Sequence, residues 1–353
     1  MSACPVRPAT TRPSTSGTAP SVAARLLPSD RFGTNEVPRA TIHSVSATAP
    51  SRARLTISYV VWPSVMVASL FAAWSGFALG ISTPLWAFVV STATFLAVFG
   101  LEHAMPAVSG WSLLRDRQSI NDIGHGILIG GVGRPLAMPL TVGFIGLVVA
   151  VDDGARASGP WPHAWSMAAQ VALGLFLWSF ANYWTHRWFH RVERLWWFHA
   201  LHHDPTRMQL LKGNRIHIGE DLLRYVVMLA PLLLLGASGR VVLWIAMWNN
   251  VEGTLAHSNV DMRFPGVLHW VLPTPQNHRV HHSSDRALQD SNFAGITPAW
   301  DQLFGTYRHP DRHPVVEFGL GDGSSVPQGF VAQLALPFRA RPKEGLAFVS
   351  RRG

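Results

Sequence analysis

Histidines are the residues of this chain most able to do chemistry, because eight of them gather in three short segments. The segments are His186-x-x-x-His190, His199-x-x-His202-His203 and His278-x-x-His281-His282. Spacings of three and four residues place two imidazoles on the same face of a helix. Imidazole is the commonest side-chain metal ligand, and neutral nitrogen donors without thiolates suit iron, copper or zinc rather than magnesium or calcium. The three segments therefore predict a polyhistidine metal site.

The number of nitrogen donors indicates more than one ion. Eight imidazoles exceed what one tetrahedral or octahedral ion can bind, so two metal ions are expected. Two redox-active irons close together can bind and split O2, which one zinc ion cannot do. The Trp196-Trp197-Phe198 run before the second segment supplies apolar surface. It is expected to anchor this segment at a membrane interface or to line a lipid-facing cavity.

The composition predicts an integral membrane protein. The chain is 48% hydrophobic and 14% charged, against roughly 25% charged in ordinary soluble domains, and it contains 15 tryptophans. The net charge of +9 comes from basic residues that adjoin apolar segments, so membrane topology explains it better than nucleic-acid binding. The single cysteine, Cys4, excludes a disulfide framework and a cysteine-based zinc site.

Three regions are expected along the chain. Residues 1–54 are rich in Ser, Thr, Ala, Pro and Arg and poor in acidic and aromatic residues, which predicts a disordered cytoplasmic tail. A similar composition occurs in organellar transit peptides, so that alternative stays open. Residues 55–315 are expected to form the membrane-embedded enzyme domain, and residues 316–353 a C-terminal tail.

The elements that must position the histidines are apolar helices. Four segments are long enough to cross about 30 Å of hydrocarbon. These four expected spans are Ile57–Ile81, Thr83–Leu101, Pro135–Val151 and Ser166–Trp184, with an interfacial piece at Ile120–Gly133 before the third. Two shorter segments, Leu222–Gly236 and Val241–Ala256, are expected to be thin spans or a pair that enters the bilayer and returns. The predicted fold is all-α: a polytopic membrane bundle with a helical cap that carries the metal site.

Basic residues predict the orientation of this bundle. They are frequent in the N-terminal tail and in the loops after the second and fourth spans, whereas the loop at 152–165 contains only Arg156 beside two aspartates. Because cytoplasmic loops are enriched in Lys and Arg, all three histidine segments are expected on the cytoplasmic face.

The sequence around the histidines resembles the fatty acid hydroxylase/sterol desaturase superfamily, whose members are membrane di-iron oxygenases. The order HxxxH, HxxHH, HxxHH carries the resemblance, together with longer motifs that extend over roughly residues 100–308. These motifs are Asn182-Tyr-Trp-Thr-His186-Arg-Trp-Phe-His190, Leu195-Trp-Trp-Phe-His199-Ala-Leu-His-His203, Arg215-Ile-His217, His257-Ser-Asn259-Val, Pro275-Gln-Asn-His278-Arg-Val-His-His282, Asn292-Phe-Ala-Gly and Trp300-Asp-Gln-Leu-Phe-Gly-Thr-Tyr307.

The resemblance implies a function and a set of ligands. The eight histidines of the three segments would bind two Fe2+ ions, and His257 would be a ninth ligand. The enzyme would use O2 to hydroxylate or desaturate a lipid, such as a sterol, a fatty acyl or sphingoid chain, an alkylglycerol or a carotenoid. Electrons would come from a cytochrome b5 or a ferredoxin with an NAD(P)H reductase, because the chain has no HPGG haem segment and no GxGxxG fingerprint.

Two positions depart from the family pattern, and four residues are candidate neighbours of the ligands. Asn182 stands where members commonly have an acidic residue, and Asp261 where some have a histidine. Asp261 is open to three interpretations: an oxygen ligand, a residue that orients an imidazole, or an ordinary loop acid. His217 and Asn259 complete the candidates, and His217 is alternatively expected to pair with Glu220. His125 is expected to be structural.

Two other classes of protein remain as alternatives. A membrane haem protein would place isolated histidine pairs in the middle of facing spans, whereas these histidines lie in groups at span ends. A zinc-binding hydrolase would need a general base, yet no HExxH motif and no carboxylate inside the histidine segments is present.

Overall fold

The computed structural model describes residues 51–81, 83–111, 116–151, 159–321 and 324–340, and it describes the side chains of all of these except 83–84 and 144–151. Within these ranges the regular elements are helices, accompanied by isolated bridges, so the all-α prediction is confirmed. The prediction of a disordered tail concerns residues that lie almost entirely outside the described ranges. The predicted domain boundaries stay predictions.

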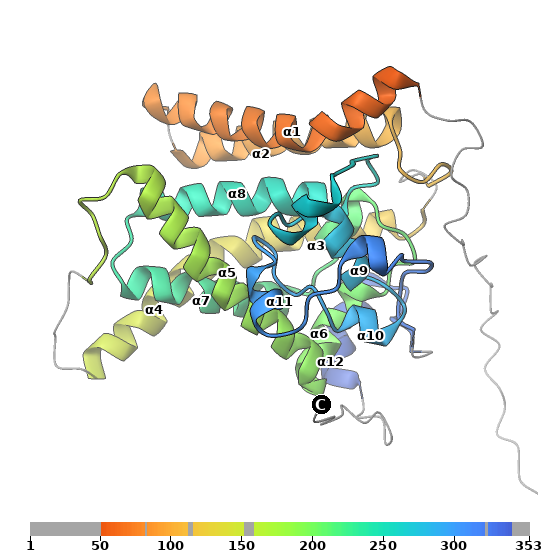
Figure 1. The fold of residues 1–353 in the computed structure, drawn as a ribbon. Coiled ribbons are helices and arrows are strands. Elements are labelled where there is room, and N and C mark those ends of the chain that lie inside the picture. Colours follow the sequence, from red (N-terminus) through yellow and green to blue (C-terminus); the bar gives the residue numbers. More distant parts are fainter. Residues whose placement is uncertain (1–50, 82, 112–115, 152–158, 322–323, 341–353) are drawn as a thin grey trace, which may run out of the picture. The chain divides into compact units, whose positions relative to one another are not determined.

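The described residues form long helices and a set of shorter elements that follow or connect them (Figure 1). The long helices are α1 (Arg52–Ala78), α2 (Thr83–Ala104), α4 (Arg134–Val151), α5 (Met167–Arg191), α7 (Ile218–Leu234) and α8 (Gly239–His257). The shorter elements are α3 (Ser119–Leu128), the π-helix η2 (Ile129–Gly133), α6 (Glu193–His203), the 3-10 helices η3 (Leu210–Asn214), η4 (Gly266–Trp270) and η5 (Pro310–Arg312), and α9 (Pro275–His281), α10 (Arg286–Gln289), α11 (Ala299–Leu303) and α12 (Phe330–Arg339).

Helix α8 connects two parts of the bundle: α1, α2 and α5 pack on it, whereas α4 packs on α7. Trp62 of α1 and Val98 of α2 are buried in one core cluster with Leu255 of α8. On the other side of α8, Gly174 of α5 approaches Ile245 so closely that an added Cβ would lie 2.5 Å from the Ile245 Cδ1 atom. A small residue at such a crossing lets two helices approach closely, which is how helices pack in membranes. The position of α8 matters for the site because its last residue is His257.

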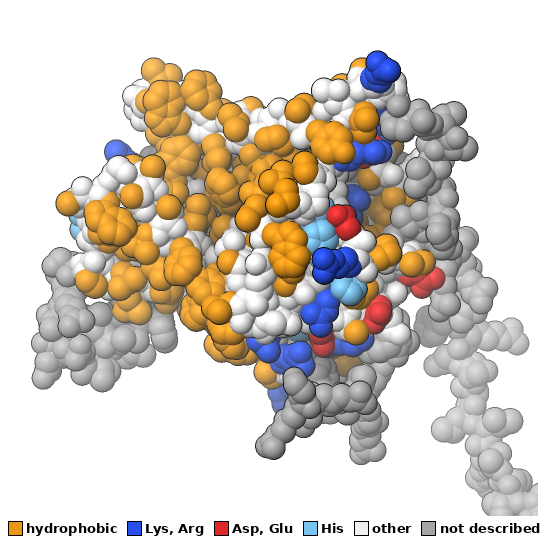
Figure 2. Space-filling model, viewed as in Figure 1, with side chains coloured by type: hydrophobic (Ala, Val, Ile, Leu, Met, Phe, Trp, Pro, Cys, Tyr) orange, Lys and Arg blue, Asp and Glu red, His pale blue; other side chains and the backbone are white. Residues whose placement is uncertain are grey.

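Three helical stretches have the length and apolar composition to cross a membrane. They are Arg52–Ala78, Leu85–Ala104 and Ser119–Gly143. Large apolar side chains such as Phe71 of α1 and Phe88 of α2 are exposed in the structure, as lipid-facing residues would be. Figure 2 shows hydrophobic side chains gathered over α1 and α2, whereas charged side chains gather over the region of α9 and α10. These helices and their exposed apolar side chains indicate an integral membrane protein.

The structure modifies two details of the predicted spans. The expected interfacial piece and the expected third span form one continuous helical run, α3–η2–α4, in which three glycines accompany the π-helical turn. The expected fourth span is α5, but polar residues such as Gln170 and Asn182 keep it out of the three candidate stretches. The number of spans therefore remains a prediction.

A buried charge cluster joins α3 to η3 and α6. The Lys212 ammonium group lies 2.6 Å from the Asp116 carboxylate and 2.5 Å from that of Asp122. Arg215 bridges Asp122 to Asp204, at 3.4 and 2.7 Å. These contacts fix the segment that follows α6, the helix that carries His199, His202 and His203.

Replacing Lys212 by Met is expected to destabilise the protein by about 3 kcal/mol, because it removes one member of a buried ion cluster and leaves carboxylates without their partner. The measurement is the midpoint of thermal unfolding in detergent micelles. The double variant Lys212→Met/Asp116→Asn should recover part of the loss, since Asp116 is the carboxylate left without its ion pair, whereas Asp122 keeps Arg215. An unchanged midpoint in the single variant would show that the cluster is not a stabilising element.

Candidate metal centre

The structure brings nine histidines together from four elements. Helix α5 contributes two from its last turns, α6 contributes three, α8 contributes its final residue, and α9 with its C-cap contributes three. They form a five-histidine group (His186, His190, His199, His203 and His281) and a four-histidine group (His202, His257, His278 and His282). Within each group, one nitrogen from every residue lies within 4.8 Å of the others.

Each HxxHH segment divides between the two groups. In α6, His199 and His203 are one turn apart with ring centroids 4.8 Å from each other, and both belong to the five-histidine group. Their neighbour His202 belongs to the four-histidine group, because consecutive residues point about 100° apart around a helix. In α9 the i, i+4 pair His278 and His282 belongs to the four-histidine group, and only His281 joins the five-histidine group. Two metal positions therefore share the same two helices.

The hydrogen bonds of the five-histidine group indicate which nitrogens face a metal. The Nδ1–H groups of His186 and His281 donate to the carbonyls of Phe293 and Ser291, both at 2.8 Å. A carbonyl only accepts, so the Nε2 atoms of these rings carry bare lone pairs. His199 also uses Nδ1, 2.7 Å from the Glu220 carboxylate. Its Nε2 atom then faces the Nε2 atoms of His186 and His203 at 3.0 and 3.1 Å. Facing lone pairs repel, and a cation between them removes the repulsion.

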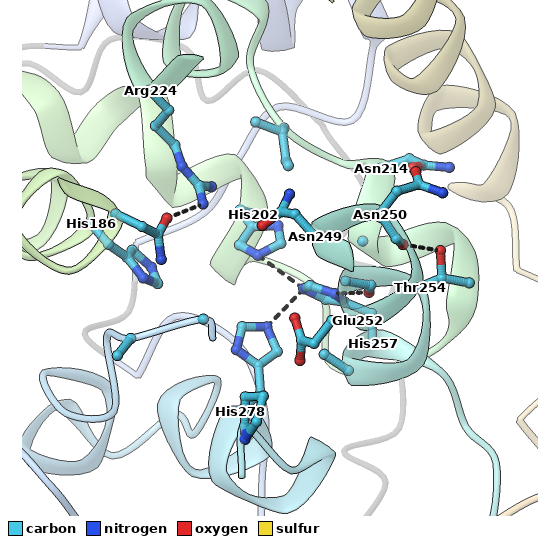
Figure 3. Close-up of a pocket in the computed structure, with 18 of the residues that line it drawn as sticks. His186, His202, Asn214, Arg224, Asn249, Asn250, Glu252, Thr254, His257 and His278 are labelled. Atoms are coloured by element: carbon cyan, nitrogen blue, oxygen red, sulfur yellow. Dashed lines mark hydrogen bonds between the residues drawn. The ribbon is translucent and has the colours of Figure 1, made fainter. Parts of the chain in front are cut away.

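The four-histidine group has the same arrangement. The Nδ1–H group of His257 donates to the carbonyl of Gly253 at 3.0 Å, which leaves its Nε2 atom without a proton. That atom lies 2.8 Å from Nε2 of His278 and 3.1 Å from Nε2 of His202 (Figure 3). The Nε2 atoms of His278 and His282 are 3.0 Å apart. Four converging imidazole nitrogens, of which that of His257 carries no proton, fit a metal ion.

Burial keeps these imidazoles neutral, which is the form that binds metals. Burial, followed by repulsion from neighbouring imidazoles, lowers the pKa of His281 to about 3. The same causes hold the pKa values of His202 and His203 in α6 well below the ordinary range. They do the same for His278 and His282. Each group therefore offers neutral nitrogen donors near pH 7.

Comparisons with known proteins place this geometry in a family. Residues 171–306, which contain both histidine groups, match the fatty acid hydroxylase family model. The ornithine lipid hydroxylase OlsE of Rhizobium tropici is 36% identical over 296 residues, which cover 83% of this chain and 88% of that protein. The chain belongs to the fatty acid hydroxylase family. It is therefore an oxidoreductase related to hydroxylases and monooxygenases, and its histidine groups mark it as a metal-binding one.

Other members of the fatty acid hydroxylase family are similar over shorter stretches. Human alkylglycerol monooxygenase is 30% identical over 42% of this chain and 32% of its own length. Methylsterol monooxygenase 1-3 of Arabidopsis thaliana is 29% identical over 43% of this chain and 53% of its own length. No solved structure matches the chain significantly.

Carboxylates orient two of these histidines. Glu220 of α7 is fully buried; it accepts from His199 and lies 3.4 Å from an Arg224 amino group. Asp290 lies 3.1 Å from Nδ1 of His190, and its side chain is 21% exposed. A carboxylate on the second ring nitrogen fixes the orientation of a metal-binding imidazole and increases its basicity.

The four candidate neighbours of the ligands have different positions. Asn182 accepts from Arg224 at 2.8 Å and lines a cavity beside the histidines. Asn259 holds the segment after α2 through two hydrogen bonds with the backbone of Val108. Asp261 pairs with Arg263 at 3.2 Å, outside both histidine groups, as a loop acid would. The fourth candidate is His217.

His217 also lies outside both groups. Its Nδ1 atom caps the start of α7, and its Nε2 atom hydrogen-bonds the carbonyl of Leu334 at 3.0 Å. Glu220, its expected partner, contacts His199 instead. His125 hydrogen-bonds Gln333 of α12 at 3.0 Å, which is a structural role.

A cavity of about 160 Å³ adjoins both histidine groups. Its walls include His186 of the five-histidine group and His202, His257 and His278 of the four-histidine group. Polar side chains complete the lining from α5, α7 and α8; Figure 3 labels Arg224, Asn249, Asn250, Glu252 and Thr254 among them. A substrate in this cavity lies beside both candidate metal positions.

The spacing of the histidines gave no indication of three polar residues beside them: Glu252, Arg224 and Asp290. The sequence contains a signal for Glu252, because Asn249-Asn250-Val-Glu252 interrupts an otherwise apolar segment shortly before His257. Polar residues in such a segment are costly unless they serve a site.

Proposed function

We propose that this protein is an O2-dependent di-iron monooxygenase that hydroxylates a membrane lipid. The observation that carries the proposal is the convergence of nine histidine nitrogens into two groups beside one shared cavity. Hydroxylation is favoured over desaturation because the similar proteins are hydroxylases and monooxygenases. Iron is favoured over zinc because such reactions require a redox-active metal and all the donors are imidazoles.

The residues of this chain would divide the work as follows. The five-histidine and four-histidine groups would each hold one Fe2+ ion, and iron would activate O2, the oxidant needed to break an unactivated C–H bond. Glu220 and Asp290 keep the rings of His199 and His190 turned so that Nε2 faces the metal position. Burial of these groups excludes bulk water, which would otherwise compete for the coordination positions.

The structure and the comparisons argue against the two alternative classes. A haem would need two axial nitrogens on opposite sides of a flat cofactor, but here the nitrogens crowd together within 4.8 Å in groups of four and five. A hydrolytic zinc site is disfavoured by the comparisons instead, because the similar proteins are hydroxylases and monooxygenases, whose reactions need a redox-active metal.

The proposed substrate is a lipid with an amino-acid head group of the ornithine lipid class. The ornithine lipid hydroxylase is similar over 83% of this chain and 88% of its own length. The alkylglycerol and methylsterol enzymes are similar over 64% of this chain or less and over 53% of their own length or less. Alkylglycerols and sterols are the second candidates.

The proposed topology has four membrane crossings with the histidines on the cytoplasmic face. The support is the basic loop sequence after α5, together with three stretches of suitable length and composition. Electrons would come from a separate cytochrome b5- or ferredoxin-type protein with its NAD(P)H reductase.

The test is turnover of an ornithine lipid by the iron-loaded enzyme in lipid nanodiscs, with a ferredoxin and its reductase as electron source. We expect a product heavier by one oxygen atom, which carries the label when ¹⁸O2 is supplied. Product formed without O2 or without reductant would overturn the oxygenase assignment. Oxidation of an alkylglycerol or a sterol but not of an ornithine lipid would overturn the substrate class alone.

A further inference from the structure

Glu252 is a buried carboxylate for which the metal centre provides no role. It lies on α8, is 6% exposed and lines the cavity beside the histidines. Among the residues that the structure describes, it has no hydrogen-bond donor, basic side chain or other electrostatic partner. Burying a carboxylate without a partner is costly, so such a group usually has a cation close by.

The other charged residues of the cavity already have neighbours of opposite charge. Arg224 contacts Glu220 and Asn182, and Asp221 lies within electrostatic range of Arg134 and Arg224. Glu252 is therefore the one carboxylate among the cavity residues described that has no neighbour of opposite charge. A cationic group of a ligand that enters this cavity would supply the missing partner and stabilise the ionised carboxylate.

A metal ion is not the partner that the geometry favours. Carboxylate oxygens are metal ligands as readily as imidazoles, yet those of Glu252 belong to neither group of converging donors. Figure 3 shows the carboxylate beside His257 and His278 within the cavity. The position suits a group of the substrate that is held next to the metal.

We propose that Glu252 binds a primary ammonium group of the substrate, as a specificity-determining residue of the cavity. This inference rests on the proposed function and gives it a specific contact: the head group of an amino-acid lipid enters the cavity with its ammonium on Glu252. Arg224 stands across the same cavity, and its buried Nε–H has no acceptor among the residues described, so the head group's carboxylate would find a donor there. A zwitterionic head group matches this pair of opposite charges.

Two short-chain compounds test the contact directly. N-octanoyl-L-ornithine and N-octanoyl-L-norvaline share an acylated α-nitrogen and a free carboxylate, and differ by the terminal ammonium. Calorimetric titration of the iron-loaded wild-type enzyme is expected to show the ornithine compound binding roughly thirtyfold more tightly, as for a buried charge pair. In Glu252→Gln this preference should disappear, while binding of the norvaline compound and iron content stay unchanged. Asp311→Asn, which removes a carboxylate whose side chain is 62% exposed, is the matched control and should retain the preference.

The outcomes separate this inference from the proposed function. Equal binding of the two compounds to the wild type, or loss of iron in Glu252→Gln, would overturn the role of Glu252, and the second result would make it a metal ligand. A wild-type enzyme that prefers the ornithine compound but oxidises no lipid would contradict the proposed function and leave the contact intact. Retained norvaline binding in Glu252→Gln shows that the variant is folded.

Discussion

Replacing His199 by Ala is expected to remove one of two bound metal ions and to reduce turnover by more than about a hundredfold. His199 is fully buried, and its Nε2 atom lies 3.0 and 3.1 Å from those of His186 and His203, so it is central to the five-histidine group. Loss of an outer-shell partner typically costs 10–100-fold in affinity or activity, and loss of a ligand should cost more. The measurements are iron per folded chain and rate of product formation.

The four-histidine group provides the reciprocal experiment. His278→Ala should remove the other ion, and the double variant His199→Ala/His278→Ala should bind none. His125→Ala is the control, because this histidine is equally buried but hydrogen-bonds Gln333 outside both groups. Full iron content in His199→Ala would contradict the assignment of His199 as a ligand. Loss of both ions in each single variant would contradict the hypothesis that each group holds its own ion.

The spacing of the histidines predicted their convergence but not their division between two groups. The i, i+4 pairs His186/His190 and His199/His203 each share a group, as their helical spacing predicts. Helical geometry turns the third histidine away from the i, i+4 pair within each HxxHH segment. Which histidines of the other elements join each side depends on long-range packing, for which one sequence contains no local signal.

The carboxylates that contact the histidines were harder to predict than the convergence of the histidines themselves. Glu220 is separated from His199 by 21 residues, and Asp290 from His190 by 100. Spacing along a helix is informative only for residues on the same element, so these contacts had no periodicity to reveal them. The expected pairing of Glu220 with the nearer His217 illustrates this limit, because His217 caps α7 while Glu220 lies one turn further along and contacts α6.

The membrane spans show a similar limit. Apolar length alone located α1 and α2 closely, because their residues face lipid or an apolar core. It was less informative about whether α5 and α8 cross the membrane, because residues such as Asn182 and Glu252 face a cavity inside the bundle and make these helices less apolar. A helix that lines a site loses apolar character in proportion to the residues it contributes to that site.

Replacing Glu220 by Gln is expected to reduce iron affinity and turnover by roughly 10–100-fold. The substitution keeps the shape of the side chain but removes the negative charge that lies 2.7 Å from Nδ1 of His199. It also permits the amide to donate to Nδ1, which would place the proton of the ring on Nε2 and withdraw that atom from the metal. The measurements are the iron dissociation constant, determined with a competing chelator, and the rate of product formation. Asp290→Asn is the matched variant, and its effect should be smaller because that carboxylate is partly exposed to solvent.

A double-mutant cycle decides whether Glu220 acts through His199 or only stabilises the fold. Glu220 also contacts Arg224 at 3.4 Å, so its loss weakens an ion pair that does not involve the metal. If Glu220 serves to orient His199, adding Glu220→Gln to His199→Ala should cause no further loss of iron, because the imidazole it orients is already absent. A purely structural role would make the two losses additive in both iron content and unfolding temperature. Non-additive iron loss with additive loss of thermal stability would show that one carboxylate performs both tasks, through His199 for the metal and through Arg224 for the packing of α7.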